Sequence, residues 1–168
     1  NIEENMGFLN YTRTKLALRG ILYFLNFQLS KYTRSFLQGP FLVILQVNKK
    51  CNLNCIYCNI SKNLSRISEL STEEIKEIID SLKLHRISYI SITGGEPLLR
   101  EDIFEIIKYI KEKGLGVHMN SNGTLITKKV AKKINESGLD AIHISLDATD
   151  SKIHDKLRGK GSFYKTIK

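Results

Sequence analysis

The sequence predicts an α/β fold built on a parallel β-sheet. Short apolar runs rich in β-branched residues alternate with segments whose apolar residues recur at helical spacing, and a polar motif follows each run directly. Such alternation is typical of parallel strands joined by right-handed helical crossovers. Ligand sites in these sheets gather at the carboxyl ends of the strands, so we expect the polar motifs to share one rim. A chain of 168 residues is long enough for one domain with a core.

The most apolar segment of the chain, residues 16–29, lies near the beginning and contains Arg19. It is too short to cross a membrane, which takes about 20 apolar residues, and it lacks the cleavage site of a signal peptide. We expect an amphipathic helix that packs on the domain, with binding at a membrane interface as the alternative. Residues 1–40 are therefore expected to form a basic, partly helical extension, and residues 41–168 the main domain.

The first strand is predicted at residues 41–47, a continuous apolar run of the kind found in strands that are buried on both faces. Ser71 to Glu74 reads as a capping box, and isoleucines and a leucine at helical spacing continue the helix that follows. A second strand is predicted at residues 87–93, where Gly94 and Gly95 end it.

The second half of the chain repeats this order. Asp102 is expected to cap a helix that ends at Lys113-Gly114, and residues 117–119 are predicted to form a short third strand. A lysine-rich helix is predicted at residues 127–137 and a fourth strand at residues 141–146. Ser162 is expected to cap a helix that begins at Phe163.

All three cysteines of the chain lie in one stretch, Cys51, Cys55 and Cys58, with the spacing CxxxCxxC. No cysteine remains for a separate disulfide, which indicates a reducing, cytoplasmic environment and a metal or cluster site. Three thiolates on a short loop suit three corners of a [4Fe-4S] cube and leave one iron without a protein ligand. Zinc usually takes four ligands in two spaced pairs, and no histidine lies nearby, yet a zinc site remains the alternative.

A second polar motif, Gly94-Gly95-Glu96-Pro97, ends the second predicted strand. Two glycines let a backbone approach a ligand closely. Glu96 supplies an acceptor suited to an ammonium group. A plain tight turn is the alternative, and the neighbouring cysteine loop favours the ligand site.

The net charge of +9 is unevenly distributed, because no Asp or Glu occurs between Asn5 and Ser68 while nine Lys and Arg residues do. One interpretation is a surface for anionic lipid, nucleic acid or an acidic partner. We favour the simpler interpretation, a solvated basic face that also offsets the negative charge of a thiolate-ligated cluster. Charge alone specifies no partner.

Taken in order, the segments CNLNCIYC, ITGGEPLLR, SNGTLI and ISLDATDSKIHDKLRGKGSF resemble the radical S-adenosylmethionine (SAM) enzyme superfamily over residues 41–168. The resemblance implies a partial (βα)6 TIM-like barrel, of which this chain would hold strands one to four of a core domain incomplete at its C-terminus. The ending is most similar to the branch with SPASM or twitch extensions. TGGEPLLRED also resembles the GTP-cyclising enzyme of molybdenum-cofactor synthesis, but Ser91 stands where that family has an arginine.

The resemblance also implies a role for individual residues. Cys51, Cys55 and Cys58 match the cluster ligands, and SAM would chelate the fourth iron. The remaining matches are Tyr57 near the adenine, Gly94, Gly95 and Glu96 at the methionyl ammonium, Ser145 on strand four, Arg158 at the SAM carboxylate, and Asn122 as a rim contact.

The activity implied is reductive cleavage of SAM to a 5′-deoxyadenosyl radical, which abstracts hydrogen from a substrate such as a peptide or a cofactor precursor. A ferredoxin or flavodoxin would donate the electron, nucleic acid is not expected as a partner, and the basic N-terminal segment is a candidate for peripheral membrane contact. Two alternatives stay open: a zinc-binding module associated with nucleic acid, and an inactive fragment whose four strands leave the barrel open.

Overall fold

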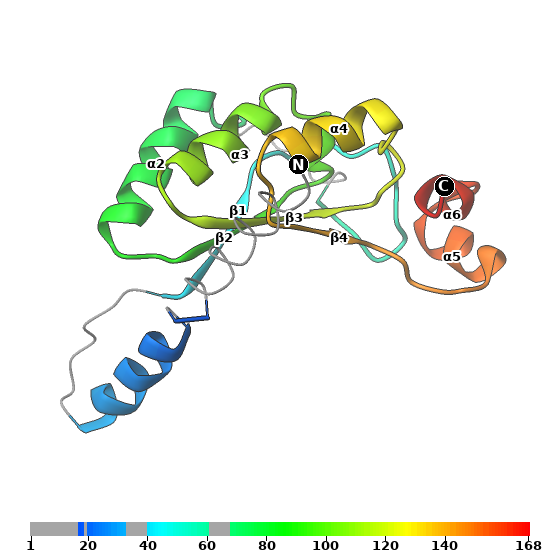
Figure 1. Cartoon of the computed structure of the whole chain (residues 1–168). Helices are drawn as coiled ribbons and strands as arrows, with labels where there is room; N and C mark the ends of the chain where they lie inside the picture. The colour runs from blue at the N-terminus through cyan, green and yellow to red at the C-terminus, as the bar shows by residue number, and fades with distance from the viewer. Residues whose placement is uncertain (1–16, 19, 33–39, 61–67) are drawn as a thin grey trace, which may run out of the picture.

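The computed structural model describes residues 17, 18, 20–32, 40–60 and 68–168. Its centre is a sheet of four parallel strands in the order β1-β2-β3-β4 (Figure 1). The strands are β1 (Leu42–Gln46), β2 (Tyr89–Thr93), β3 (Gly116–Ser121) and β4 (Ala141–Ile144). Each pairs in parallel with its neighbour, with Ile44 opposite Ser91, Ser91 opposite His118, and His118 opposite Ala141. The predicted α/β class is confirmed.

Three helices join successive strands and lie on one face of the sheet (Figure 1). They are α2 (Thr72–Leu84), α3 (Ile103–Glu112) and α4 (Lys128–Glu136). The capping box at Ser71 is present as predicted, since its hydroxyl accepts from the Glu74 amide and the Glu74 carboxylate accepts from the Ser71 amide. Thr127 caps α4 in the same way through the Val130 amide.

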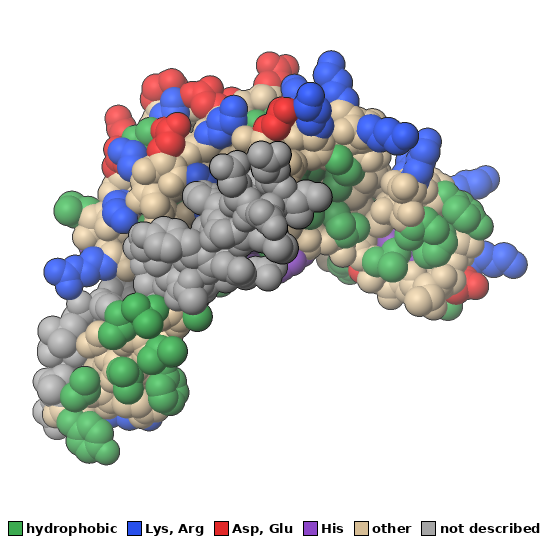
Figure 2. Space-filling view, viewed as in Figure 1, with side chains coloured by type: hydrophobic (Ala, Val, Ile, Leu, Met, Phe, Trp, Pro, Cys, Tyr) green, Lys and Arg blue, Asp and Glu red, His purple; other side chains and the backbone are tan. Residues whose placement is uncertain are grey.

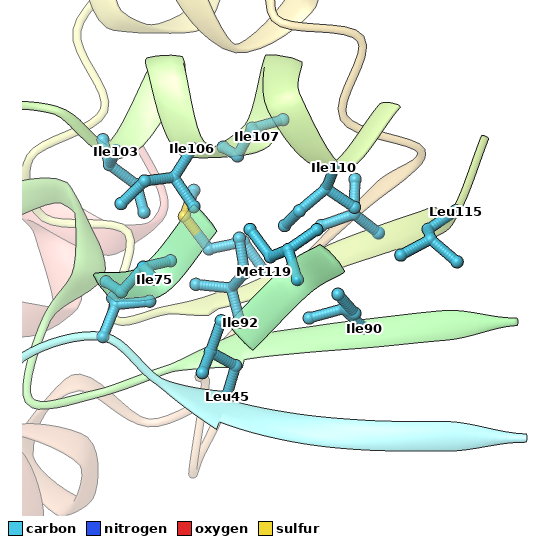
Figure 3. Packing of buried hydrophobic residues seen from close by; sticks show 13 residues of the cluster. Leu45, Ile75, Ile90, Ile92, Ile103, Ile106, Ile107, Ile110, Leu115 and Met119 are labelled. Carbon is cyan, nitrogen blue, oxygen red and sulfur yellow. The ribbon is translucent and has the colours of Figure 1, made fainter. Parts of the chain in front are cut away.

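The hydrophobic core lies between these helices and the sheet (Figure 3). Ile90, Ile92 and Met119 point from the strands toward Ile75 and the stripe of isoleucines on α3, and all of these side chains are fully buried. The isoleucines at helical spacing on α3 and the inward-pointing residues of β2 and β3 therefore pack together in one layer.

The opposite face of the sheet is open among the described residues. Ile44 is 68% exposed and Leu42 is 42% exposed, so the prediction that the first strand is buried on both faces is wrong. Its physical reason is that α2, α3 and α4 all cover the same face. On the open face the rings of Tyr89, His118 and His143 follow one another at centroid distances of 5.3 and 4.6 Å.

Two cap predictions are wrong. Asp102 precedes α3, but its side chain makes no capping bond and instead accepts from Arg100 and Thr72. The helix α6 (Ser162–Thr166) already includes Ser162, whose hydroxyl bonds Asp155. The left-handed Gly161, with φ 78°, precedes the helix instead.

Two further elements were not predicted from the sequence, the helix α5 (Ser151–Arg158) and the short 3-10 turn η1 (Pro97–Leu99). Asp150 caps α5 by accepting from the Lys152 and Ile153 amides. His154 lies fully buried on this helix. Helices α5 and α6 sit beside the carboxyl end of the sheet (Figure 1).

Residues 17, 18 and 20–32 are helical, and the helix of residues 20–32 projects away from the sheet (Figure 1). Its apolar side chains gather on the surface (Figure 2), with Phe24 59% and Leu25 51% exposed. Tyr23 contacts Phe41 at a ring distance of 5.8 Å. The predicted helix is present, but its expected packing on the domain is not seen among the described residues. No helix in the described part of the chain is long and apolar enough to cross a membrane.

Candidate radical SAM site

The polar motifs meet along one rim of the sheet, as predicted. The cysteine loop leaves β1, and the turn after β2 is bonded to it, because the Gly95 amide donates to Asn48 O at 3.1 Å and the Glu96 amide to Lys50 O at 2.8 Å. At the other side, the Ser145 amide donates to Ser121 O at 2.9 Å. Backbone hydrogen bonds thus join the end of β1 to the end of β2, and the end of β3 to the end of β4.

Gly94 and Gly95 allow the turn after β2 to touch the cysteine loop directly. A Cβ atom on Gly94 would lie 2.1 Å from Asn48 Oδ1, and one on Gly95 would lie 2.2 Å from Lys50 O. Real side chains cannot approach this closely, so both positions require glycine. The space that the two glycines leave is filled by the protein's own backbone, and this contact fixes where the cysteine loop begins.

Glu96 joins the end of β2 to the end of β3 from a fully buried position. Its Oε1 accepts from Ser121 Oγ at 2.8 Å and from the Leu98 amide at 3.2 Å, while Oε2 accepts from the Asn122 amide at 2.8 Å. Burial raises the pKa of Glu96, and these hydrogen bonds act in the opposite direction. From inside the fold, the carboxylate therefore holds the turn after β2 against the end of β3.

The three cysteines lie on this rim as free thiols, with Cys55 buried and the other two half-buried. The Leu53 amide donates to Cys51 Sγ at 3.4 Å, and Asn122 Nδ2 lies 4.0 Å from the same sulfur. Burial raises the pKa of the Cys55 thiol, and the nearby Arg158 acts in the opposite sense.

The donor set fits an iron–sulfur cluster, since it offers thiols on one loop with N–H groups directed at Cys51 Sγ. Among the described residues, no three His, Cys, Asp or Glu side chains are placed to hold a single metal ion.

Tyr57 and Arg158, predicted to contact SAM, come from different parts of the chain and meet at Asp147. The Tyr57 hydroxyl donates to Asp147 Oδ2 at 2.5 Å. Arg158 donates from Nε and Nη2 to the two oxygens of the same carboxylate, at 2.8 and 2.7 Å. The Arg158 guanidinium also lies 5.8 Å from the centre of the Tyr57 ring. Ser145 lies half-buried two residues before Asp147.

Two further polar groups support the rim and were not predicted in these roles. Asn122 donates from Nδ2 to Asn52 Oδ1 at 2.9 Å and accepts from the Thr124 amide and hydroxyl, which joins the cysteine loop to β3. Arg100 donates from Nη1 to Val47 O and Leu70 O while its other edge binds Asp102. The sequence signal for Asn122 was its place after β3, whereas Arg100 gave none beyond its position after the glycine turn.

Residues 45–168 match the family model of the radical SAM superfamily. The chain belongs to the radical SAM superfamily. It is 38% identical over 127 residues to "Mycofactocin maturase MftC" of Mycolicibacterium smegmatis, a match that covers 76% of this chain and 32% of that protein. It is 35% identical over 131 residues to "AdoMet-dependent heme synthase" of Methanosarcina barkeri, which covers 77% of this chain and 38% of the relative. The radical SAM chain thus spans about a third of the length of these curated relatives.

Solved structures show the same fold at lower identity. Streptococcus suis SuiB bound to precursor peptide SuiA aligns with a TM-score of 0.65 and 23% identity, over 77% of this chain and 29% of SuiB. The structure titled anSMEcpe with bound AdoMet aligns with a TM-score of 0.62 and 24% identity, over 75% of this chain and 38% of that one. These findings confirm the predicted radical SAM family and enzyme class, its fold, and the pair of cofactors that the family uses, a [4Fe-4S] cluster and SAM.

Proposed function

We propose that this radical SAM domain, residues 41–168, holds a [4Fe-4S] cluster through Cys51, Cys55 and Cys58 and binds SAM at the iron that these thiolates leave open. The observation that carries the proposal is the rim itself. All the cysteines of the chain lie on one loop, and the glycine turn fixes the start of that loop by backbone contact. Three cysteines on one short loop are typical ligands of an iron–sulfur cluster.

The other rim residues are proposed to bind SAM. Gly94, Gly95 and Glu96 form the segment for the methionyl ammonium, and Oε2 of Glu96 accepts a single protein hydrogen bond, which leaves it further acceptor capacity. Arg158 is proposed for the carboxylate, because a guanidinium fork can bind both carboxylate oxygens. Ser145 is proposed as a further contact and Tyr57 as the residue beside the adenine.

The cluster and SAM together supply a 5′-deoxyadenosyl radical that takes a hydrogen atom from the substrate. The protein residues hold both cofactors in register and limit access of other hydrogen donors. We propose a peptide or a cofactor precursor as the substrate, since the similar proteins include a maturase and a haem synthase. We also propose a ferredoxin- or flavodoxin-type electron donor and a cytoplasmic location, supported by three cysteines without a disulfide.

The experiment is anaerobic reconstitution with iron and sulfide, reduction, addition of SAM and measurement of 5′-deoxyadenosine. The wild type is expected to form it, and Cys55→Ala to form none because the cluster loses a ligand. Asn54→Ala is the matched control, since Asn54 is exposed in the same loop. Formation by Cys55→Ala, or a colourless protein that holds stoichiometric zinc after reconstitution, would contradict the proposal.

A second proposal concerns the helix of residues 20–32, which we infer to contact an anionic membrane surface. Its exposed side chains include large apolar residues, and Lys31 is exposed at its end. An exposed apolar surface next to basic residues is typical of interfacial helices. The surrounding stretch carries no acidic residue between Asn5 and Ser68, so nothing in it opposes binding to negative lipid headgroups.

A further inference from the structure

Asp147 contacts two of the residues proposed to bind SAM, although it was not itself predicted to lie at the SAM site. Its carboxylate accepts from Arg158 with both oxygens and from the Tyr57 hydroxyl with Oδ2. Tyr57 lies in the cysteine loop and Arg158 at the end of α5, so one carboxylate after β4 joins three separate elements. Its place, just beyond Ser145, puts it on the rim.

The bond to Asp147 leaves one edge of the Arg158 guanidinium available. Asp147 uses the Nε and Nη2 edge, and within the described residues Nη1 has no hydrogen-bond acceptor. A guanidinium carries five N–H donors in a rigid plane, so fixing one edge also fixes the direction of the other. The free edge can still bind a second carboxylate through two parallel hydrogen bonds.

Backbone contacts hold both partners of Asp147 in place. The Ile56 amide donates to Leu157 O at 2.9 Å, and Cys55 Sγ lies 3.9 Å from Arg158 O, so the last turn of α5 rests on the cysteine loop. The Asp147 amide points to Nδ1 of the buried His154 at 3.4 Å. The hydrogen bonds from Arg158 lower the pKa of Asp147, so the pair consists of a carboxylate and a guanidinium at neutral pH.

We propose that Asp147 is a positioning residue that holds the Arg158 fork with its free edge toward the methionyl carboxylate of SAM and holds Tyr57 on the same side of the rim. The inference rests on the proposed function, because it needs SAM at this rim. Asp147 itself does not contact SAM. It acts through the direction that it gives to Arg158.

The test is the dissociation constant of SAM for the reconstituted, unreduced protein, in which SAM is not consumed. Asp147→Asn is expected to weaken SAM binding at least tenfold, because an amide keeps one accepting oxygen and puts an NH2 donor where the second oxygen faced Arg158. Binding of the S-adenosyl compound that lacks the methionyl carboxylate is expected to change less than twofold. Asp147→Glu, which keeps the charge, is expected to recover part of the affinity for SAM.

Asp150→Asn is the matched control, since it makes the same carboxylate-to-amide change at the start of α5, and no bond between Asp150 and Arg158 is present among the described residues. It is expected to leave both dissociation constants within twofold. Equal weakening of both ligands by Asp147→Asn would assign it a merely structural role and overturn the inference, as would unchanged SAM binding. A wild type that holds the cluster yet binds no SAM would instead refute the proposed function, and the inference with it.

One readout does not depend on either cofactor. In the free wild-type protein, the Arg158 Nε–H is expected to give a separate, slowly exchanging nitrogen–proton NMR signal, because Asp147 accepts from it. The signal should disappear in Asp147→Asn and remain in Asp150→Asn. A signal unchanged in Asp147→Asn would contradict the contact on which the inference is built.

Discussion

Glu96 shows how one buried side chain sets the arrangement of the rim. Three donors from η1 and from the end of β3 converge on its carboxylate. Glu96→Gln replaces one accepting oxygen by an NH2 group, which must face a donor. We expect a loss of about 2–3 kcal/mol in the free energy of unfolding, the usual cost of an unmatched hydrogen bond to a charged group.

Urea unfolding measures this loss, and Glu101→Gln is the control because Glu101 is exposed and lies close by in the sequence. Equal stability of the two variants would show that Glu96 does not tie β2 to β3.

Asp102 gives the fold a defined response to acid. Burial raises its pKa, but the bonds from Arg100 and Thr72 outweigh this, so the folded pKa lies below the ordinary 3.8. Its contribution to stability is therefore complete above pH 3.8 and is lost as the pH falls through the lower folded value. Asp102→Asn is expected to cost about 1–2 kcal/mol at pH 7, with the difference from wild type shrinking below pH 3.8.

Chemical denaturation across this pH range measures the difference. Glu112→Gln, at an exposed position, should show no such pH dependence. A difference for Asp102→Asn that stays constant down to pH 2 would contradict the assigned role.

At the residue scale, the sequence predicted the cysteines and the glycines but not the contacts of Asp147. The three cysteines lie within eight residues of one another, so the sequence alone shows that they can bind one cluster. The Tyr57 hydroxyl donates to the Asp147 carboxylate from 90 positions away, and no local sequence pattern predicts such a pair. Glu96 was predicted as an acceptor for an ammonium group, and only the fold shows that the protein's own donors already bind both of its carboxylate oxygens.

The close contact between the glycine turn and the cysteine loop gives a prediction at the scale of elements. Gly95→Ala places a Cβ atom 2.2 Å from Lys50 O, which is backbone and cannot rotate away. The loop must shift, so we expect less iron per chain after reconstitution. Gly20→Ala is the control, because nothing lies within 4 Å of a Cβ atom at that position.

Iron and sulfide analysis, with circular dichroism to confirm folding, decides the outcome. Full iron content in a folded Gly95→Ala protein would show that the turn does not fix the loop.

The bounds of the strands and of the long helices were predicted to within a few residues, because each element combines a periodic apolar pattern with a cap or a terminating glycine. Helix α5 was missed since it has only eight residues and exposes Ile153, so it shows little apolar stripe. Tertiary contacts hold α5 in place. The buried His154 packs edge-on against Phe163, and Leu157 O accepts from the Ile56 amide.

At the scale of the whole molecule, the sequence predicted the parallel sheet but not which of its faces is covered. A continuous apolar run does not show whether one or both faces of the strand are covered. In β1, Ile44 lies on the open face of the sheet. The N-terminal helix was likewise predicted as an element, but its exposure depends on contacts that sequence periodicity cannot give.

The membrane proposal is tested by flotation with vesicles of phosphatidylcholine and phosphatidylserine. Replacing Leu22 and Leu25 together by glutamate is expected to weaken binding at least tenfold, since burying each leucine is worth about 1.5–3 kcal/mol. Ile153→Glu is the control, an equally exposed apolar residue on α5. Equal binding by the double variant and the control would contradict contact through this helix.

The central claim, a three-cysteine cluster whose open iron binds SAM, is tested most directly by electron paramagnetic resonance. The reconstituted protein is reduced anaerobically and its spectrum recorded before and after SAM is added. We predict the signal of a reduced [4Fe-4S] cluster that shifts on addition of SAM, with no cluster signal in Cys55→Ala. A cluster signal that SAM leaves unchanged would contradict the account.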